Sequence, residues 1–298
     1  MNNLDTAPLT PDALEGELLS LCSRYPALSR RTLGKSILGR DIPLLLLGRG
    51  KRKLLYVATH HATEWLTTRL LLTFLAELCE AAEARVRPYG IDAEFLLCRR
   101  MLCFVPMLNP DGVAIHLGIS DDPLAERRRH MTENSDFTHW QANARGVDLN
   151  HNYAVGFAEY KAEEAALGIM GGAPTRYSGD APESEPETAA LAAFIRSVRP
   201  GLVMSLHTQG EEIYYRGGGS ELPGARAAAL RLSSLSGYRI AEPSGPAAYG
   251  GLCDYTTASL GIPSFTVECG RGENPLPPSD APLIYARLRR MLFESITM

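Results

Sequence analysis

The sequence lacks several features that mark particular classes of protein. No Cys-x-x-Cys pair occurs among its six cysteines, which are scattered along the chain and lie mostly within apolar runs. No stretch approaches the ~18 apolar residues that a membrane-spanning helix needs. No basic stripe with interleaved aromatic residues accompanies the net charge of −4. These absences predict a protein with neither a membrane nor a nucleic-acid partner.

The first residues and the cysteines predict where the protein acts. Residues 1–5 include no cationic segment followed by an apolar one, so we expect no signal peptide. Cysteines of a protein that stays in a reducing compartment remain thiols. We therefore expect six free, mainly buried thiols and a cytoplasmic location. Neither the composition nor the pattern predicts an oligomeric state.

Length and periodicity indicate one α/β domain. At 298 residues, 45% of them hydrophobic, the chain can bury one large core, and no linker or internal repeat divides residues 1–298. Apolar runs predict strands at 42–47, 54–59, 95–107, 202–206 and 262–267. Helical patterns cover 11–22, 65–83, 185–198, 224–236 and 281–295, and Ser184 with Glu187 has the spacing of a capping box. This alternation predicts an α/β sandwich with a largely parallel sheet.

Metal-ligating side chains follow two of the predicted strands. His61 and Glu64 lie three residues apart after the run 54–59, and His207 ends the run 202–206. The carboxyl ends of adjacent parallel strands meet at one edge of a sheet. Two histidines, one carboxylate and an open position form a catalytic zinc site, so we predict that these three residues bind one Zn²⁺. A lone histidine here is usually a hydrogen-bonded strand end, and it is the pairing with His-x-x-Glu that favours a ligand. His60 is expected to be a neighbour of the site, because its side chain points to the other face.

A third strand ends in Glu268, followed by Cys269-Gly270-Arg271-Gly272. A carboxylate at this position can take a proton from a zinc-bound water and pass it to a leaving amine. The alternative interpretation is a surface glutamate before a turn. We interpret Glu268 as the general base, because it lies at the end of the third strand.

The same residues belong to motifs that resemble those of a known family. The motifs are His61-Ala62-Thr63-Glu64-Trp65, Asn109-Pro110-Asp111-Gly112, Gly146-Val147-Asp148-Leu149-Asn150, Ser205-Leu206-His207 and Phe265-Thr266-Val267-Glu268. Their order resembles that of the M14 zinc carboxypeptidases, over roughly residues 30–295. The resemblance implies a three-layer α/β/α sandwich around a mixed eight-stranded sheet. It also implies that residues 1–298 form one catalytic domain, with zinc on His61, Glu64 and His207 and Glu268 as the base.

Three positions depart from the family's pattern. His151 stands where ordinary carboxypeptidases have the arginine that binds the substrate's terminal carboxylate. Thr63 and Gln141 occupy two further positions where the family commonly has arginine. Because histidine is no equivalent of a permanently charged, two-pronged guanidinium, an ordinary C-terminal exopeptidase is the less favoured activity.

Other segments resemble the bacterial γ-D-glutamyl-meso-diaminopimelate peptidases of the same class. They are His207-Thr208-Gln209-Gly210-Glu211-Glu212-Ile213-Tyr214-Tyr215, Gly270-Arg271-Gly272-Glu273-Asn274-Pro275-Leu276-Pro277 and Pro182-Glu183-Ser184-Glu185-Pro186-Glu187-Thr188. The resemblance implies a small, murein-derived peptide as substrate and a role in murein-peptide recycling. Two alternatives stay open: a zinc amidohydrolase that deacylates N-acyl amino acids, and a non-catalytic protein that binds murein peptides.

A substrate rich in carboxylates needs cations near the metal. The candidate arginines are Arg271, Arg145 and Arg216, each of which could instead form a surface ion pair. Asn150 and His151 are predicted to hold a substrate carboxylate, and Tyr249 to donate a hydrogen bond to the substrate. Asp148 is expected to orient a zinc-binding histidine.

Overall fold

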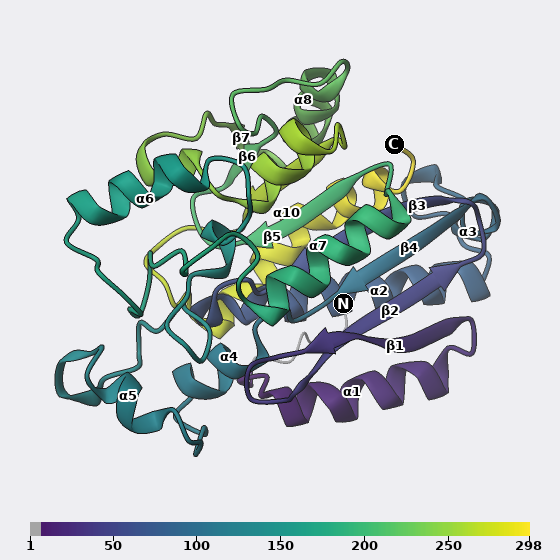
Figure 1. The fold of residues 1–298 in the computed structure, drawn as a ribbon. Helices are drawn as coiled ribbons and strands as arrows, with labels where there is room; N and C mark the ends of the chain where they lie inside the picture. The colour runs from purple at the N-terminus through teal and green to yellow at the C-terminus, as the bar shows by residue number, and fades with distance from the viewer. Residues whose placement is uncertain (1–6) are drawn as a thin grey trace.

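A central eight-stranded sheet runs through the computed structural model of the protein, which describes residues 7–298 (Figure 1). Residues 1–6, which include the segment predicted not to be a signal peptide, lie outside the described residues. The strands are β1 Leu28–Lys35, β2 Asp41–Gly48, β3 Arg52–Ala58, β4 Arg100–Val105, β5 Val203–His207, β6 Glu212–Tyr214, β7 Arg239–Ile240 and β8 Ser264–Glu268. The α-helices are α1 Pro11–Arg24, α2 Leu66–Glu83, α3 Ala93–Arg99, α4 Pro110–His116, α5 Ala125–Arg129, α6 Phe157–Ala166, α7 Pro186–Val198, α8 Ala225–Ser236, α9 Leu252–Asp254 and α10 Ala281–Ser295.

The sheet is parallel at its centre and mixed at its edges. Its order is β1-β2-β4-β3-β5-β8-β6-β7, and the four central strands β4, β3, β5 and β8 pair in parallel. Strands β1 and β2 at one side and β6 at the other are antiparallel to their inner neighbours. The predicted α/β sandwich with a mixed, largely parallel sheet is therefore confirmed. Because β3, β5 and β8 are parallel neighbours, their carboxyl ends share one edge.

Helices cover both faces of this sheet, because successive side chains of the central strands point to opposite sides. Leu54 and Tyr56 of β3 belong to a large apolar cluster with residues of α1, α2, α8 and α10. Leu55 and Val57 belong to a second cluster with Leu191 of α7 and other residues on the opposite face. Figure 1 shows α7 in front of the sheet and α10 and α2 behind it. The result is the expected three-layer arrangement, with the strand ends left free for a site.

The structure corrects two sequence predictions. The run 95–107 is not one strand: α3 occupies its first part, with Asp92 accepting a hydrogen bond from the backbone of Phe95 at 2.9 Å, and only β4 joins the sheet. The capping box of Ser184 and Glu187 is wrong, since α7 begins after Glu185 without a side-chain cap. Oε1 of Glu187 instead accepts a hydrogen bond from the backbone of Ile37 at 3.1 Å. Tertiary contacts override the local pattern in both places.

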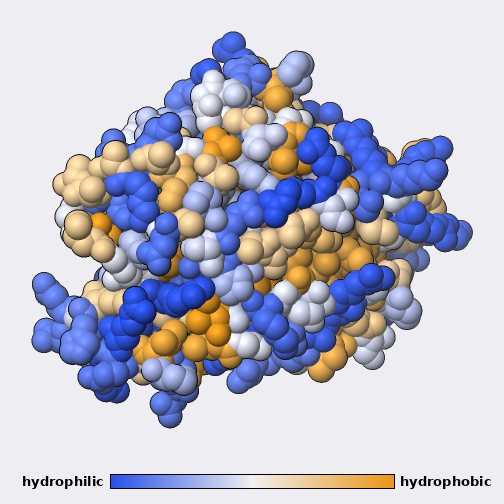
Figure 2. Space-filling model, viewed as in Figure 1, coloured by the Kyte–Doolittle hydropathy of each residue, from blue (hydrophilic) through white to orange (hydrophobic). Residues whose placement is uncertain are grey.

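The face shown in Figure 2 is mostly hydrophilic, with apolar residues visible between α7 and the strands of the β1–β2 side. These elements contribute partly buried side chains that pack on the second cluster, including Leu33, Leu46 and Phe194. In residues 7–298, no helix is both long and apolar enough to span a bilayer.

Candidate metal centre

The turn after β3 places His61 and Glu64 side by side. His61 is extended (φ −96°, ψ 136°), and a single 3-10 turn, Ala62–Glu64, leads into α2. The side-chain amide of Asn109 holds this turn by donating to the carbonyls of His60 at 3.0 Å and Ala142 at 3.2 Å. The turn therefore depends on contacts with residues far along the chain, and it directs both side chains to the carboxyl edge of the sheet.

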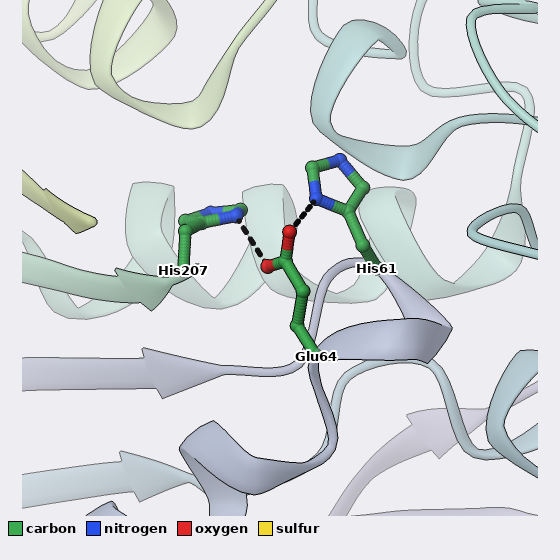
Figure 3. A group of neighbouring side chains, drawn as sticks. All are labelled: His61, Glu64 and His207. Atoms are coloured by element: carbon green, nitrogen blue, oxygen red, sulfur yellow. Dashed lines mark hydrogen bonds and ion pairs between the residues drawn. The ribbon is translucent and has the colours of Figure 1, made fainter. Parts of the chain in front are cut away.

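His61, Glu64 and His207 meet at that edge, as Figure 3 shows. Nδ1 of His61 lies 2.9 Å from Oε1 of Glu64, and Nδ1 of His207 lies 3.1 Å from Oε2 of the same carboxylate. One donor atom from each residue lies within 4.8 Å of the other two. Two imidazole nitrogens and one carboxylate are the donor set of catalytic zinc sites with three protein ligands. The predicted ligands are thus brought together in a geometry that suits Zn²⁺.

Two further side chains orient these donors. Nε2 of His61 lies 3.1 Å from Oδ1 of Asp148. This contact agrees with the expectation that Asp148 orients a zinc-binding histidine. Nδ2 of Asn274 donates to Oε1 of Glu64 at 3.3 Å and to the carbonyl of Thr208 at 2.8 Å. Sequence reasoning missed Asn274, whose only signal was its place within a motif of the narrower resemblance. Both contacts restrict the positions in which the donor atoms can lie.

The electrostatics of the cluster favour charge pairing across it. Burial disfavours a charged imidazole, but the carboxylates of Glu64 and Asp148 raise the pKa of His61 well above its usual value. Burial likewise opposes ionisation of Glu64, and the adjacent His61 and His207 outweigh it and lower the pKa of that carboxyl to about 2. The Glu64 carboxyl is therefore anionic throughout the physiological range.

Glu268 lies beside the donor cluster at the end of β8. It pairs in register with His207 of β5 and with Glu212 of β6, so the three side chains project from the same face of the sheet. Removal from water, followed by repulsion from Glu64 and Glu212, raises the pKa of Glu268 well above its usual value, while His61 opposes this rise. The Glu268 carboxyl thus lies on the same face of the sheet as the imidazole of His207.

His60 is a neighbour of the cluster and lies outside its donor set, in agreement with the sequence prediction. Its ring stacks on that of His207 with centroids 5.1 Å apart, and its Nε2 lies 3.1 Å from the hydroxyl of Tyr153. Burial, followed by the two neighbouring histidines, lowers the pKa of His60 well below its usual value. A neutral His60 can pack against His207 without adding charge.

The residues predicted to bind substrate lie on two adjoining loops. Nδ1 of His151 lies 2.8 Å from the carbonyl of Tyr249, and the His151 ring stacks on Tyr160 at 3.8 Å. Oδ1 of Asn150 accepts a hydrogen bond from the backbone of Leu252 at 3.2 Å. Gly250, at φ +76°, allows this approach, because a Cβ there would lie 2.9 Å from the carbonyl oxygen of His151. Asn150, His151 and Tyr249 are therefore brought together, with the side chains of the first two fixed by the loop 249–252.

The three candidate arginines all form ion pairs with glutamates. Nε of Arg145 lies 3.0 Å from Oε2 of Glu185, and Nε of Arg271 lies 2.7 Å from Oε2 of Glu211. Arg216 is paired in the same way. Glu185 and Glu211 are buried, so Arg145 and Arg271 each neutralise a carboxylate that is costly to leave unpaired, and Arg287 also pairs with Glu211. Binding of substrate by Arg145 or Arg271 stays a prediction.

Comparisons with known proteins agree with this geometry. The sequence profile of the family described as zinc carboxypeptidase, Peptidase_M14, matches residues 15–286. The chain is 34% identical to gamma-D-glutamyl-L-diamino acid endopeptidase 1 of Lysinibacillus sphaericus, over 90% of this chain and 67% of that protein. It is 31% identical to the uncharacterized protein YqgT of Bacillus subtilis strain 168, over 95% of this chain and 76% of that protein. Among solved structures, carboxypeptidase A from Helicoverpa armigera shares the fold, with a TM-score of 0.74 at 17% identity over 98% of this chain and 74% of its own.

Proposed function

The chain belongs to the M14 family of zinc carboxypeptidases, and from this premise we propose that it hydrolyses γ-D-glutamyl–diaminopimelate bonds in murein peptides. Membership of the family makes it a zinc metallopeptidase. The observation that carries the finer assignment is its 34% identity to an endopeptidase named for the γ-D-glutamyl–diamino acid bond. The replacement of arginine by Thr63, Gln141 and His151 supports a substrate other than that of an ordinary carboxypeptidase.

We assign the metal to Nδ1 of His61, the carboxylate of Glu64 and Nδ1 of His207. Asp148 holds the His61 ring so that Nε2 carries the proton and Nδ1 is left to bind the ion. When bound, zinc supplies the Lewis acid that polarises the scissile carbonyl and makes an attacking water more acidic. Asn274 fixes one oxygen of Glu64 through its side-chain amide.

Glu268 is the proposed general base. Its carboxylate takes a proton from the attacking water and delivers that proton to the nitrogen of the leaving amine. The position of Glu268 at a strand end, in register with His207, supports this role because both groups must face the same carbonyl.

Asn150 and His151 are proposed to hold a carboxylate of the substrate, with Tyr249 donating a hydrogen bond from the adjoining loop. In residues 7–298 no hydrogen-bond partner is present for Nε2 of His151, whose Nδ1 is held by the Tyr249 carbonyl. This leaves one ring nitrogen for a ligand. Action in the cytoplasm, on peptides released during turnover of the cell wall, stays a prediction.

A panel of substrates tests the proposal. The zinc-loaded protein is incubated with L-Ala-γ-D-Glu-meso-diaminopimelate, with its α-linked isomer and with a set of N-acetyl amino acids, and products are identified by mass spectrometry. We expect release of diaminopimelate from the γ-linked peptide alone. Deacylation of N-acetyl amino acids without cleavage of the γ-linked peptide would establish the amidohydrolase instead. Tight binding of the peptide without turnover would indicate a binding protein.

A further inference from the structure

A short segment, residues 174–177, connects Gln141, one of the positions that depart from the family's pattern, with Asp148. The carbonyl of Pro174 accepts hydrogen bonds from the backbone of Gln141 and of Ala142, each at 2.9 Å. The hydroxyl of Thr175 donates to Oε1 of Gln141 at 2.7 Å. At its other end, the carbonyl of Tyr177 accepts from the backbone of Asp148 at 2.7 Å. This bridging segment therefore runs beside the carboxylate that supports His61.

Arg176 lies in the middle of the bridging segment, and its backbone is held on both sides. Its N–H donates to Oδ2 of Asp148 at 3.1 Å, and its carbonyl accepts from the hydroxyl of Tyr160 at 3.2 Å. Arg176 has φ +66°, a left-handed backbone conformation that is unfavourable for residues other than glycine. Such a conformation persists where surrounding contacts enforce it. The position of Arg176 relative to Asp148 and Tyr160 is thus fixed.

The side chain of Arg176 differs from those of the arginines predicted from sequence. It is exposed, and within residues 7–298 its guanidinium has neither a hydrogen-bond acceptor nor a carboxylate partner. Arg145 and Arg271, in contrast, each pair with a buried glutamate. Withdrawing Arg145 to bind a ligand would leave the buried Glu185 carboxylate without its arginine, whereas Arg176 can bind an anion without such a loss. Glu211 would keep Arg287 as a partner if Arg271 were withdrawn.

The charge of Arg176 also acts on His151, one of the predicted substrate residues, and on Tyr160, against which His151 stacks. Burial is the main reason why the pKa of His151 is lowered. Asp148 and the carbonyl of Tyr249 oppose this shift, and the positive charges of His61 and Arg176 add to it. Burial raises the pKa of Tyr160, and the charge of Arg176 opposes that rise. The Tyr160 and His151 rings stack on each other, so the charge of Arg176 lies close to this stacked pair.

We propose that Arg176 binds a carboxylate of the substrate, next to His151 and Asn150, and that it supplies the cation missing at positions 141 and 151. The inference rests on the proposed function, whose substrate carries three carboxylates. A guanidinium offers two parallel N–H donors to a carboxylate, which gives orientation as well as affinity. Arg176 is accordingly a specificity-determining residue, with no part in proton transfer.

The test measures binding in the zinc-loaded Glu268→Gln protein, which leaves the ligand intact. Dissociation constants are determined by calorimetry for L-Ala-γ-D-Glu-meso-diaminopimelate and for its three monoamides, each lacking one carboxylate. These dissociation constants are compared between the protein that keeps Arg176 and its Arg176→Gln and Arg176→Lys variants. The matched control is Arg85→Gln, because Arg85 is also exposed and has a positive φ of 53°. Arg85 follows the far end of α2, roughly 27 Å along the helix from the metal cluster.

We expect Arg176→Gln to weaken binding of the peptide by ~10- to 100-fold, with a smaller loss for Arg176→Lys and none for Arg85→Gln. One of the three monoamides should bind with equal affinity to the proteins with and without the Arg176→Gln change. This monoamide is the one that lacks the carboxylate bound by Arg176. In the active enzyme, Arg176→Gln should raise KM and leave kcat within about threefold. Equal sensitivity of all three monoamides, or equal affinity of Arg176→Gln and Arg85→Gln, would overturn the assignment.

Failure of this inference is distinct from failure of the proposed function. If the protein deacylates N-acetyl amino acids and leaves the γ-linked peptide intact, the proposed function is wrong. The same variants are then tested with an N-acetyl amino acid and its amide, which again differ by one carboxylate. Loss of discrimination between acid and amide in Arg176→Gln supports the assignment there, and unchanged discrimination overturns it. Absence of binding to every carboxylate ligand overturns both.

Discussion

Oδ1 of Asp148 lies 3.1 Å from Nε2 of His61, on the side of the ring away from the Nδ1 that faces Glu64. Asp148 also accepts hydrogen bonds from the backbone of Asn150 at 3.2 Å and of Arg176 at 3.1 Å. One carboxylate therefore connects the metal centre to two of the segments proposed to bind substrate. Its loss is expected to affect the metal first and the substrate second.

Asp148→Asn is expected to lower zinc affinity by ~10- to 100-fold, because the amide cannot stabilise the protonated Nε2 of His61 as a carboxylate does. The measurement is competition for zinc against a chelator of known affinity. Excess zinc should restore most of the lost activity.

Asp92→Asn is the matched control for this change. Asp92 also accepts a backbone hydrogen bond at the start of a helix, from Phe95 at 2.9 Å, and lies outside the metal cluster. Asparagine keeps such a cap, so zinc affinity should not change. Equal zinc affinity of Asp148→Asn and the unsubstituted protein would show that Asp148 does not support the ligand.

The fold and the metal centre were predictable because they depend on strong local signals. The apolar runs that form β2, β3, β5 and β8 are buried on both faces. Such continuous apolar runs can be recognised from the sequence. His61 and Glu64 follow β3, and His207 is the last residue of β5. Adjacency of parallel strands then brings the side chains together, so their meeting followed from the pattern.

Other features depend on contacts that no local pattern encodes. Strands β6 and β7 have three and two residues, too few for a periodic signal. The edge strand β1 is mostly exposed or partly buried, and its alternation is broken where the register shifts between Thr32 and Gly34. Arg176 belongs to no motif, and its position follows from hydrogen bonds between the bridging segment and Gln141 and Asp148. Assignment of the whole chain to one catalytic domain stays a prediction.

A buried carboxyl away from the metal predicts how stability depends on pH. Burial, with added repulsion from Asp111 and Glu185, raises the pKa of Glu187 from 4.5 to about 7. The folded state therefore keeps a proton that the unfolded state releases between pH 4.5 and 7, so the free energy of unfolding falls as pH rises through this range. At ~1.4 kcal/mol per pKa unit, the loss is about 3 kcal/mol.

Glu187→Gln should remove this part of the pH dependence. Urea unfolding at intervals between pH 4.5 and 8 measures it, and the variant's free energy of unfolding should change less across the range than that of the unsubstituted protein. Glu126→Gln, at an exposed site, should leave the profile unaltered. An unchanged slope in Glu187→Gln would show that the carboxyl titrates normally.

The six cysteines are all free in residues 7–298, as the sequence predicted, and they differ in exposure. Cys98 is exposed, while burial raises the pKa of Cys79, Cys103 and Cys253 to about 12. Because the thiolate is the reactive form, we expect one fast thiol, at Cys98, in the native protein at pH 7.5. Titration with a chromogenic disulfide measures this.

Cys98→Ser should abolish the fast phase, and denaturant without reductant should expose five thiols in that variant. Fewer thiols after denaturation would reveal a disulfide and contradict the assignment of free cysteines.

The central claim is that zinc on His61, Glu64 and His207 acts with Glu268 to hydrolyse a γ-D-glutamyl bond. Its most direct test is the turnover rate of Glu268→Gln on L-Ala-γ-D-Glu-meso-diaminopimelate, measured together with zinc content and beside Glu273→Gln, a change at an exposed position nearby. We expect kcat to fall by ~10²- to 10⁴-fold in Glu268→Gln, with one zinc per chain retained, and to be preserved in Glu273→Gln. An unchanged kcat in Glu268→Gln with zinc still bound would contradict the account.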